Sequence, residues 1–318
     1  LTGIVPLPQE GAEALRAGLA GVDASVTANA VPGAADFFKS IIPSNPIAAA
    51  ANDQILPLIL FTTVFAFAVT RLPEDQRVTL SGFFAAVADA MIIVIGWILV
   101  LAPIGVFALA FVVGARAGAG AFGALLHYVA IVSAVGLTIG AIAYPIAVFV
   151  GRVPLDRFAR EVAPVQALAI STQSSLACLP LMVQRSMALG VREPTAGLVL
   201  PMAVALLRVT GPAMNLAVAL YVANWYGIEL GPAQYAVAIL AATLTSMGAV
   251  SLPGTVSFIT SIAPISLAIG VPVEPLALLI AVETLPDIFR TMGNAQTDVA
   301  LATAVEARKD SHEVSQTR

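Results

Sequence analysis

Six polar residues between positions 283 and 298 recur at the spacing of one face of an α-helix. They are Glu283, Asp287, Arg290, Thr291, Asn294 and Asp298. At about 100° per residue they fall within an arc of roughly 100°, and the rest of the helix surface is mostly apolar. A carboxylate can hold an ammonium group or a cation, a guanidinium pairs with a carboxylate, and an amide donates and accepts. The row therefore indicates a site for an anionic or zwitterionic ligand together with cations.

Two simpler interpretations of this row compete with a binding site. Asp287 and Arg290 could form an ordinary i,i+3 ion pair, or the helix could turn its polar face to water. An ion pair would not need Asn294 and Asp298 on the same line, and the apolar run 275–282 argues against a helix that faces water. Because ionisable groups inside a membrane are costly and normally find partners in a bundle or cavity, the binding-site interpretation is favoured.

The elements that carry this row belong to a chain with the composition of an integral membrane protein. Of its 318 residues, 59% are hydrophobic and 11% are charged, with a mean hydropathy of +0.94. Soluble domains carry about 25% charged residues, and a spanning helix needs about 20 mainly apolar ones. We therefore predict an all-α protein in a lipid bilayer. Four long stretches contain no Lys, Arg, Asp or Glu: 90–115, 117–151, 162–184 and 230–273.

Other compositional features exclude some functions. The net charge of −4 gives no indication of a nucleic-acid partner. The single cysteine, Cys178, excludes an intramolecular disulfide framework. The sequence shows no Ser/His/Asp arrangement, no His/Cys metal cluster and no phosphate loop, so an enzyme is not expected. We predict no cofactor, apart from sodium ions or protons as coupling ions.

The first half of the chain predicts a loop followed by ordinary spans. Residues 1–45 are rich in Ala, Gly and Pro, show no signal peptide and are predicted to form an extramembrane loop. Because the chain begins at Leu1, we expect the N-terminus of a longer protein to be missing. Spans are predicted over 46–70, 79–114 and 124–150. At the other end, residues 309–318 are predicted to be a disordered tail.

Two later apolar segments are interrupted by polar residues. Segment 162–184 contains Ser171 to Ser175, and segment 232–271 contains Ser246 and then the run 251–254. Each is typical of two short helices joined by a polar tip at membrane depth, which persists only where protein or a watery cavity satisfies the backbone. Paired interruptions of this kind point to a transporter binding site. The alternative is four ordinary spans kinked by Ser and Pro.

The distribution of basic residues supports a return of each interrupted segment to the side from which it came. On that assumption only Arg116, with Arg16 and Lys39 of the loop, faces one side of the membrane. By the positive-inside rule the opposite side is cytoplasmic. The basic residues on that cytoplasmic side are Arg71, Arg77, Arg152, Arg157, Arg160, Arg185, Arg192, Arg308 and Lys309.

A second intramembrane charge, Arg208, lies within the apolar segment 195–227, just before Gly211-Pro212, which we expect to break the helix. A buried guanidinium needs an acid or several carbonyl groups as partners. Arg208 can therefore belong to a coupling site, or it can snorkel or form an ion pair with no role in transport. From the sequence these interpretations are equally supported.

Four blocks of sequence resemble the dicarboxylate/amino acid:cation symporters, the glutamate transporter family. Ser171 to Pro180 (STQSSLACLP) is similar to the serine-rich tip of the first re-entrant hairpin, and Ser246 to Gly254 (SMGAVSLPG) to the tip of the second. Asp287-x-x-Arg290-Thr291-x-x-Asn294-x-x-x-Asp298 matches the last helix, and Ala102 to Phe107 (APIGVF) is typical of the fifth. The similarity covers nearly the whole chain, but the first three helices of the family have no counterpart.

The resemblance implies an all-α homotrimer that moves a carboxylate or amino acid substrate across a bacterial inner membrane by an elevator motion. Residues 46–114 would form scaffold and trimerisation helices, 115–156 a transmembrane helix with flanking loops, and 157–308 the transport domain. Asp287 would hold the substrate's amino group, Arg290 its side-chain carboxylate, and Asn294 its main-chain carboxylate. The implied substrate-binding set is Ser174, Ser175, Val250, Ser251, Leu252, Pro253, Asp287, Arg290, Thr291 and Asn294.

The implied cation set is Asn294, Asp298, Ser246, Met247 and Ala249. The chain departs from the family where the seventh helix unwinds, because Leu207-Arg208-Val209-Thr210-Gly211 replaces Asn-Met-Asp-Gly-Thr. Hard cations need oxygen ligands. Leu207 and Val209 stand where the family has Asn and Asp, so two side-chain ligands are lost. We expect Arg208 to act as a built-in cation near Asp298, with reduced sodium dependence, and protons on Glu283 or Asp287 as the alternative driving ions. A transport-dead or anion-conducting paralogue is the competing interpretation.

Overall fold

The computed structural model describes residues 13, 45–51, 55–248 and 254–316, and this part of the chain contains helices and no strand. The predicted loop 1–45 therefore lies almost wholly outside the described residues. The helices are α3 (Pro46–Ala51), α4 (Ile55–Val69), α5 (Glu74–Ala141), α6 (Ala143–Pro145), the π-helix η1 (Ile146–Val150), α7 (Leu155–Thr172), α8 (Ser175–Ala188), α9 (Glu193–Leu206), α10 (Thr210–Trp225), α11 (Pro232–Gly248), α12 (Gly254–Ala268), α13 (Leu276–Leu279), the 3-10 helix η2 (Ile280–Val282) and α14 (Thr284–Gln316).

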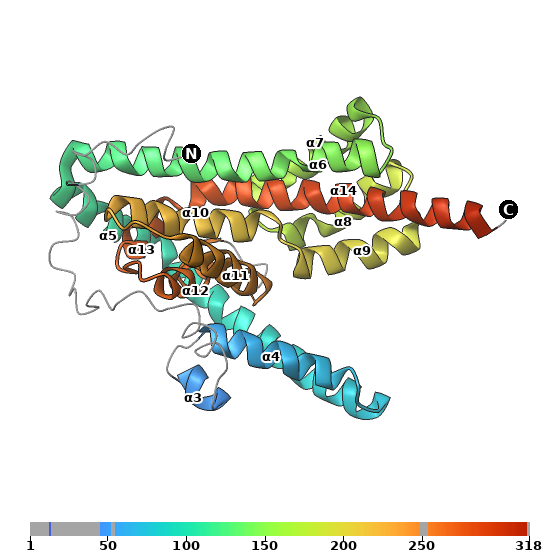
Figure 1. The fold of residues 1–318 in the computed structure, drawn as a ribbon, viewed down its shortest axis with the longest axis horizontal. Helices are drawn as coiled ribbons and strands as arrows, with labels where there is room; N and C mark the ends of the chain where they lie inside the picture. Colours follow the sequence, from blue (N-terminus) through green and yellow to red (C-terminus); the bar gives the residue numbers. More distant parts are fainter. Residues whose placement is uncertain (1–12, 14–44, 52–54, 249–253, 317–318) are drawn as a thin grey trace.

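Helix α4 and the first part of α5 form an apolar arm beside the main body (Figure 1). The two helices contact each other through aromatic rings, with Phe65 edge-on to Phe84 at 5.8 Å between centroids. Large apolar side chains are exposed on all sides of the arm, including Phe67, Phe83 and Trp97. Such a surface is unfavourable in water and suits lipid or another subunit.

Helix α5 is continuous over 68 residues, whereas the sequence predicts separate spans over 79–114 and 124–150. In Figure 1 its blue-green first part leaves the arm, and its green last part returns along the body. The reversal is therefore made within helical backbone rather than by a loop. No proline interrupts residues 104–141, so nothing in this stretch forces the backbone hydrogen bonds to end.

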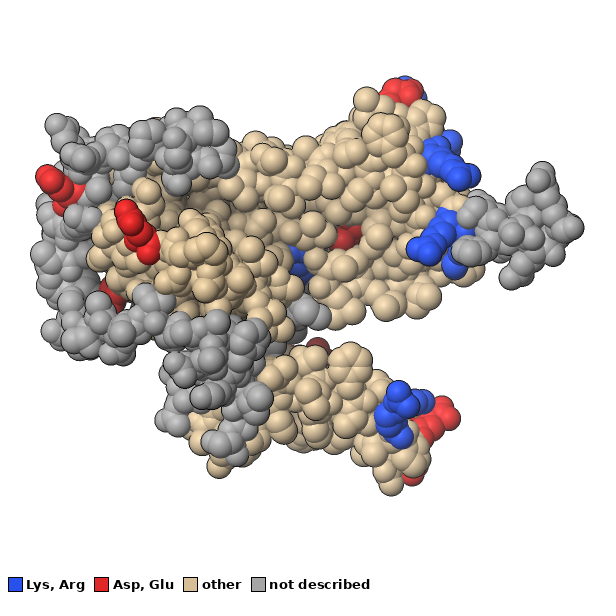
Figure 2. Space-filling model, in the orientation of Figure 1, with Lys and Arg blue, Asp and Glu red and all other residues tan. Residues whose placement is uncertain are grey.

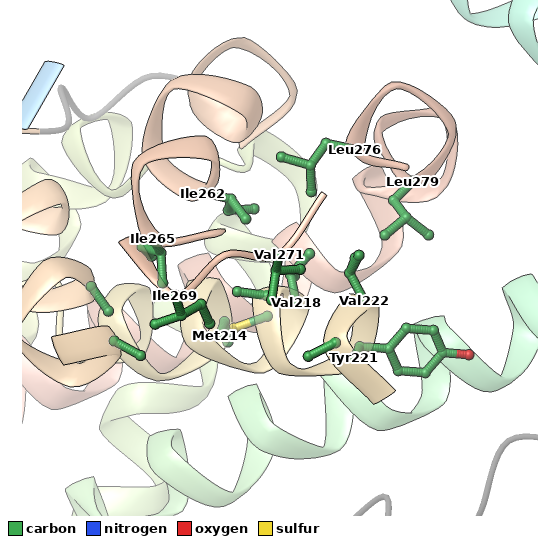
Figure 3. Packing of buried hydrophobic residues seen from close by; sticks show 14 of the residues in the cluster. Met214, Val218, Tyr221, Val222, Ile262, Ile265, Ile269, Val271, Leu276 and Leu279 are labelled. Carbon is green, nitrogen blue, oxygen red and sulfur yellow. The ribbon is translucent and has the colours of Figure 1, made fainter. Parts of the chain in front are cut away.

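Helix α14 is the central element of the body, since α5, α7, α8 and α9 all pack against it. One core, shown in Figure 3, joins Met214 and Val218 of α10 to Ile262 and Ile265 of α12 and Leu276 of α13. A second core packs α7, α8 and α9 on the middle of α14, through Ala295, Val299, Ala300 and Ala302. Helices α5 and α10 also contact α14. These contacts together fix the direction of its polar face.

The first interrupted segment folds as two helices that pack against each other, α7 and α8. Gln173 takes a left-handed conformation (φ 50°) that ends α7. The side chain of Ser174 then accepts a hydrogen bond from the backbone of Ala177 at 3.3 Å and caps α8. The second interrupted segment gives the packed pair α11 and α12, whose connection, 249–253, lies outside the described residues.

The long apolar segment with Arg208 is interrupted by residues 207–209, between α9 and α10. The sequence places this break at Gly211-Pro212, but both residues lie in the first turn of α10. Proline is tolerated there because the first backbone N–H groups of a helix have no intrahelical partner. The interruption therefore comes three residues earlier and includes Arg208 itself.

Charged side chains gather at the ends of the molecule in the view of Figure 2. The middle of the body shows little charge on this face, and basic side chains gather at the end near the C-terminal part of α14. Acidic side chains lie at the opposite end and also at the edge of the basic end, and the tip of the arm carries both signs. At the basic end Arg192 pairs with Glu306, and Lys309 donates to Thr195 at 3.1 Å. Helix α14 continues to Gln316, so residues 309–316 are helical, whereas the sequence predicted a disordered tail. The helix can extend this far because Glu, Lys and Arg are good helix formers.

Two stretches among the described residues are long and apolar enough to cross a bilayer, Phe122–Val150 and Glu193–Tyr226. Leu60–Val69 and Phe258–Ala268 are apolar but shorter. The uncharged middle of the body and the exposed apolar arm agree with a membrane environment.

Candidate functional site

The polar row lies at the start of α14 and on the residue that precedes it. Glu283 ends η2, and the other members follow along the first four turns of α14. All six side chains are buried, with Glu283 fully inaccessible and none of the others more than 5% exposed. Burial of three acids and one arginine requires partners close by, since a lone buried charge is strongly destabilising.

Arg290 is surrounded by partners from its own helix and from α10. Its Nη2 donates to Glu283 Oε1 at 2.6 Å, and its Nη1 donates to Asn215 Oδ1 at 2.8 Å. Its Nε lies 3.4 Å from Asp287 Oδ1, and this nitrogen makes no hydrogen bond among the described residues. The guanidinium therefore already holds a carboxylate on one of its terminal nitrogens.

Glu283 is held by a second contact from across the body. The hydroxyl of Tyr128, in α5, donates to Glu283 Oε2 at 3.3 Å. Each carboxylate oxygen of Glu283 thus has its own donor, Arg290 on one and Tyr128 on the other. The arrangement links the returning part of α5 directly to the polar row on α14.

Asn294 joins α14 to the start of α10. Its Oδ1 accepts a hydrogen bond from the backbone N–H of Thr210 at 2.9 Å and lies 2.8 Å from the Thr210 hydroxyl. A backbone N–H can only donate, so the orientation of the amide is fixed and Nδ2 is the atom left to meet a ligand. The single proton of the Thr210 hydroxyl is shared with the Arg290 carbonyl oxygen, 2.9 Å away. A cation bound through Oδ1 would therefore compete with the backbone N–H of Thr210.

Arg208 is half-buried and belongs to the same electrostatic set. Its positive charge lies within electrostatic range of the carboxylates of Asp287 and Asp298 and of the guanidinium of Arg290. The helix interruption at 207–209 therefore supplies a positive charge next to the row on α14. With Glu283, Asp287 and Asp298 ionised, the set of two arginines and three acids has one excess negative charge, which suits a ligand with an ammonium group or a proton.

Only some of the remaining predicted site residues lie in the part of the chain that the structure describes. Ser174 caps α8 and Ser175 is buried, in the helix pair that packs on α14. Ser246 is buried in the last turn of α11, and its hydroxyl faces the start of α10 near Gly211 without a hydrogen-bond partner among the described residues. Met247 lies in the same turn. Ala249, Val250, Ser251, Leu252 and Pro253 lie outside the described residues.

Three polar residues that contact the row were not singled out from the sequence: Tyr128, Thr210 as a partner of Asn294, and Asn215. The sequence does contain a signal for Asn215, which is the single amide side chain in the apolar run 213–223. A polar side chain inside a membrane normally hydrogen-bonds to another helix. Tyr128 gives a weaker signal, since a tyrosine near the end of a span is also expected at the interface.

Residues 11–308 match the family model described as "Sodium:dicarboxylate symporter family", and the chain belongs to this family. Its members are transporters rather than enzymes. The chain is 29% identical over 275 residues to the proton/glutamate-aspartate symporter of Escherichia coli K12, covering 83% of this chain and 61% of that protein. It is 30% identical over 281 residues to the proton/sodium-glutamate symport protein of Bacillus subtilis 168, covering 86% and 63%.

A third relative carries a different substrate name. The chain is 30% identical over 280 residues to the C4-dicarboxylate transport protein 2 of a Bradyrhizobium strain, covering 86% of this chain and 62% of that protein. The chain thus spans about three-fifths of the length of these relatives. The family is established by the match, and it implies a membrane protein.

Proposed function

We propose that the chain binds an acidic amino acid or dicarboxylate and carries it across a membrane as a secondary active symporter. The observation that supports this most directly is the buried row of Asp287, Arg290 and Asn294 beside the interrupted helix at Arg208. A guanidinium and an amide donor suit two carboxylates, and Asp287 suits an ammonium group. The names of the relatives include both glutamate-aspartate and C4-dicarboxylate transport.

An amino acid is the preferred substrate in this proposal. A plain dicarboxylate offers no partner to Asp287, so succinate would leave a buried carboxylate without its ammonium group. We therefore expect aspartate or glutamate to bind more tightly than succinate or malate. Equal or tighter binding of succinate would remove this role of Asp287.

Protons, rather than a full set of sodium ions, drive transport in this proposal. Asn294 Oδ1 already accepts from the backbone of Thr210, so one oxygen that could hold sodium is engaged. The charge of Arg208 lies within electrostatic range of Asp298 and can partly replace a sodium ion there. Glu283 occupies Arg290 as a substrate carboxylate would. An acidic substrate that replaces Glu283 on Arg290 leaves a buried carboxylate, which is far less costly when it takes up a proton. Substrate and proton uptake are thereby coupled.

The proposal includes an elevator motion and two re-entrant hairpins. Helices α7, α8, α11 and α12 contain 18, 14, 17 and 15 residues. At 1.5 Å per residue they are about 21–27 Å long, less than the about 30 Å of a hydrocarbon core. This supports hairpins that enter and leave on one side. The apolar arm would belong to the fixed scaffold of a homotrimer in a bacterial inner membrane, and the body around α14 would move.

Reconstituted uptake tests the function. Purified protein in vesicles would be given labelled aspartate, glutamate, succinate and malate, with and without sodium and with and without an inward proton gradient. We expect uptake of aspartate that needs the proton gradient and varies little with sodium. Arg290→Ala should remove uptake of acidic substrates, because it leaves a substrate carboxylate buried without a partner. Unchanged acidic uptake in Arg290→Ala would refute the site.

A transport-dead or anion-conducting paralogue is the second candidate, and the loss of two cation ligands at Leu207 and Val209 is the observation that favours it. The same vesicles separate the candidates. A symporter accumulates aspartate against its gradient with a fixed number of coupled ions, whereas an anion pore gives chloride or nitrate currents without accumulation. Neither accumulation nor current would indicate a binding protein without transport.

A further inference from the structure

We propose that Tyr128 is a positioning residue that holds the Glu283 carboxylate on Arg290, and thereby sets the pH at which an acidic substrate can replace it. The inference rests on the proposed function, because it assigns a role to Glu283 at the substrate site. It adds a residue from α5, outside the helices that form the polar row.

The contacts of Glu283 carry the first step. Its Oε1 accepts from Arg290 at 2.6 Å, and its Oε2 accepts from the Tyr128 hydroxyl at 3.3 Å. Glu283 and Tyr128 are both fully buried, so water cannot replace either donor. The tyrosine hydroxyl is thus a neutral donor to one oxygen while the guanidinium takes the other, and the carboxylate cannot turn without losing one of them.

The position of Tyr128 is itself fixed by neighbouring aromatic side chains. Its ring packs edge-on against Tyr221 of α10 at 5.2 Å between centroids. Tyr221 is held in turn, because its hydroxyl donates to the carbonyl oxygen of Ala124 at 3.1 Å and lies 3.1 Å from Nδ1 of His127. Among the interactions of the described residues, none joins Tyr221 to Glu283, and the Tyr221 hydroxyl contacts Ala124 and His127 of α5 instead.

The other groups that act on Glu283 come from α14. They are Arg290, which stabilises the carboxylate, and Asp287, which opposes it. Asn215 of α10 contacts Arg290 rather than Glu283. Arg208, in the interruption before α10, lies within electrostatic range of Arg290 and Asp287. The residues of α12 and α13 that form the core against α10, among them Ile262, Ile265 and Leu276, carry no charge (Figure 3). Removing the Tyr128 hydroxyl therefore changes one donor to Glu283 and no charge.

The expected effect follows from the preference of a hydrogen-bond donor for the charged carboxylate. A donor stabilises the ionised form more than the protonated form. Without the hydroxyl, Glu283 takes up a proton at a higher pH and releases Arg290 to substrate at that higher pH. A shift of one pH unit corresponds to about 1.4 kcal/mol, within the range for a hydrogen bond to a charged group.

The test compares Tyr128→Phe with the matched control Tyr221→Phe, which also deletes one buried tyrosine hydroxyl. Aspartate binding to the full chain in lipid nanodiscs would be measured between about pH 5 and pH 9. We expect the midpoint of the pH dependence to rise by about one unit in Tyr128→Phe and to stay at the parent value in Tyr221→Phe. In a Glu283→Gln background, Tyr128→Phe should produce no further shift.

A second readout does not need a substrate. The infrared band of a protonated carboxylic acid that disappears in Glu283→Gln reports Glu283 directly, and its pH midpoint should rise in Tyr128→Phe. If the parent binds none of the substrates, the proposed function fails while the band still tests Tyr128. If Tyr128→Phe does not fold, 3,5-difluorotyrosine at position 128 keeps the ring and is a stronger donor, so the midpoint should fall. An unmoved band, or equal shifts in Tyr128→Phe and Tyr221→Phe, overturns the proposal.

Discussion

Replacement of Glu283 by glutamine gives the most informative single change. Glutamine has nearly the same size and keeps a carbonyl oxygen for Arg290, but it removes the negative charge. Glu283 contacts Arg290 at 2.6 Å with both side chains buried, and removal of one partner of a buried pair costs about 3–5 kcal/mol. Arg290 keeps Asn215 at 2.8 Å and Asp287 at 3.4 Å. We therefore expect a loss at the lower end, about 3 kcal/mol, from the free energy of unfolding.

The same variant should bind acidic substrate more tightly at neutral pH. The parent must release Glu283 from Arg290 before a substrate carboxylate can bind, and the variant has no anion to displace. We expect at least about a tenfold gain in affinity for aspartate, or about 1.4 kcal/mol, and a flat pH dependence. Saturating aspartate should also recover stability, since about 2.7 kcal/mol is gained at a hundredfold excess over Kd.

Calorimetric binding of aspartate across pH and thermal unfolding with and without aspartate measure these effects. Glu274→Gln is the control, because it removes one acid from the link between α12 and α13 without touching Arg290. It should leave affinity and pH dependence unchanged. The reasoning is refuted if Glu283→Gln keeps the parental pH dependence, or binds aspartate more weakly than the parent at every pH.

Three further changes test other parts of the structure. Arg208→Met should raise the sodium dependence of aspartate binding or abolish binding, and a steep multi-sodium dependence in the parent would contradict a built-in cation. Gly140→Ala should lower the free energy of unfolding by about 1–3 kcal/mol, because the added Cβ would lie 2.9 Å from Gly293 Cα. Gly123→Ala is the control and should not lower it, because nothing lies within 4 Å of the added Cβ. Burial raises the pKa of Glu306, but hydrogen bonds from Thr195 and Arg192 outweigh it and hold the pKa below its ordinary value. This stabilisation is present above the ordinary pKa and is lost as the pH falls through the folded value, so acid should destabilise the parent more than Glu306→Gln.

The sequence predicted the face of α14 well because periodicity decides it. Glu283, Asp287, Arg290 and Asn294 lie on one side of any α-helix, whatever packs against them. The two short helix pairs were also predicted, since Ser171 to Ser175 interrupt an apolar run. The exact break in the segment around Arg208 was misplaced, because Pro212 is compatible with both the end of one helix and the first turn of the next.

The partners within the site could not be predicted in the same way. Tyr128 and Asn215 are 155 and 75 positions from the residues they contact, and no local pattern encodes which distant helices meet. The engagement of Arg290 by Glu283 was missed for a related reason. Arg290 was assigned to a substrate carboxylate and Glu283 to a coupling proton, although two opposite charges on one helix face can satisfy each other. The turn between the predicted spans 79–114 and 124–150 was expected to be a loop, whereas α5 stays helical through it, and no proline interrupts residues 104–141.

The close contact between α5 and α14 has a consequence for genetic screens of this chain. Gly140 lies against Gly293 and against the amide of Gln296, which donates to the Gly140 carbonyl oxygen at 2.6 Å. A screen that scores only growth on aspartate would rank both glycines with Arg290 as essential, although neither has a side chain to offer a ligand. Protein abundance scored in parallel would separate the classes: substitutions at the glycines should deplete the protein from the membrane, whereas Arg290→Lys should leave it abundant and inactive.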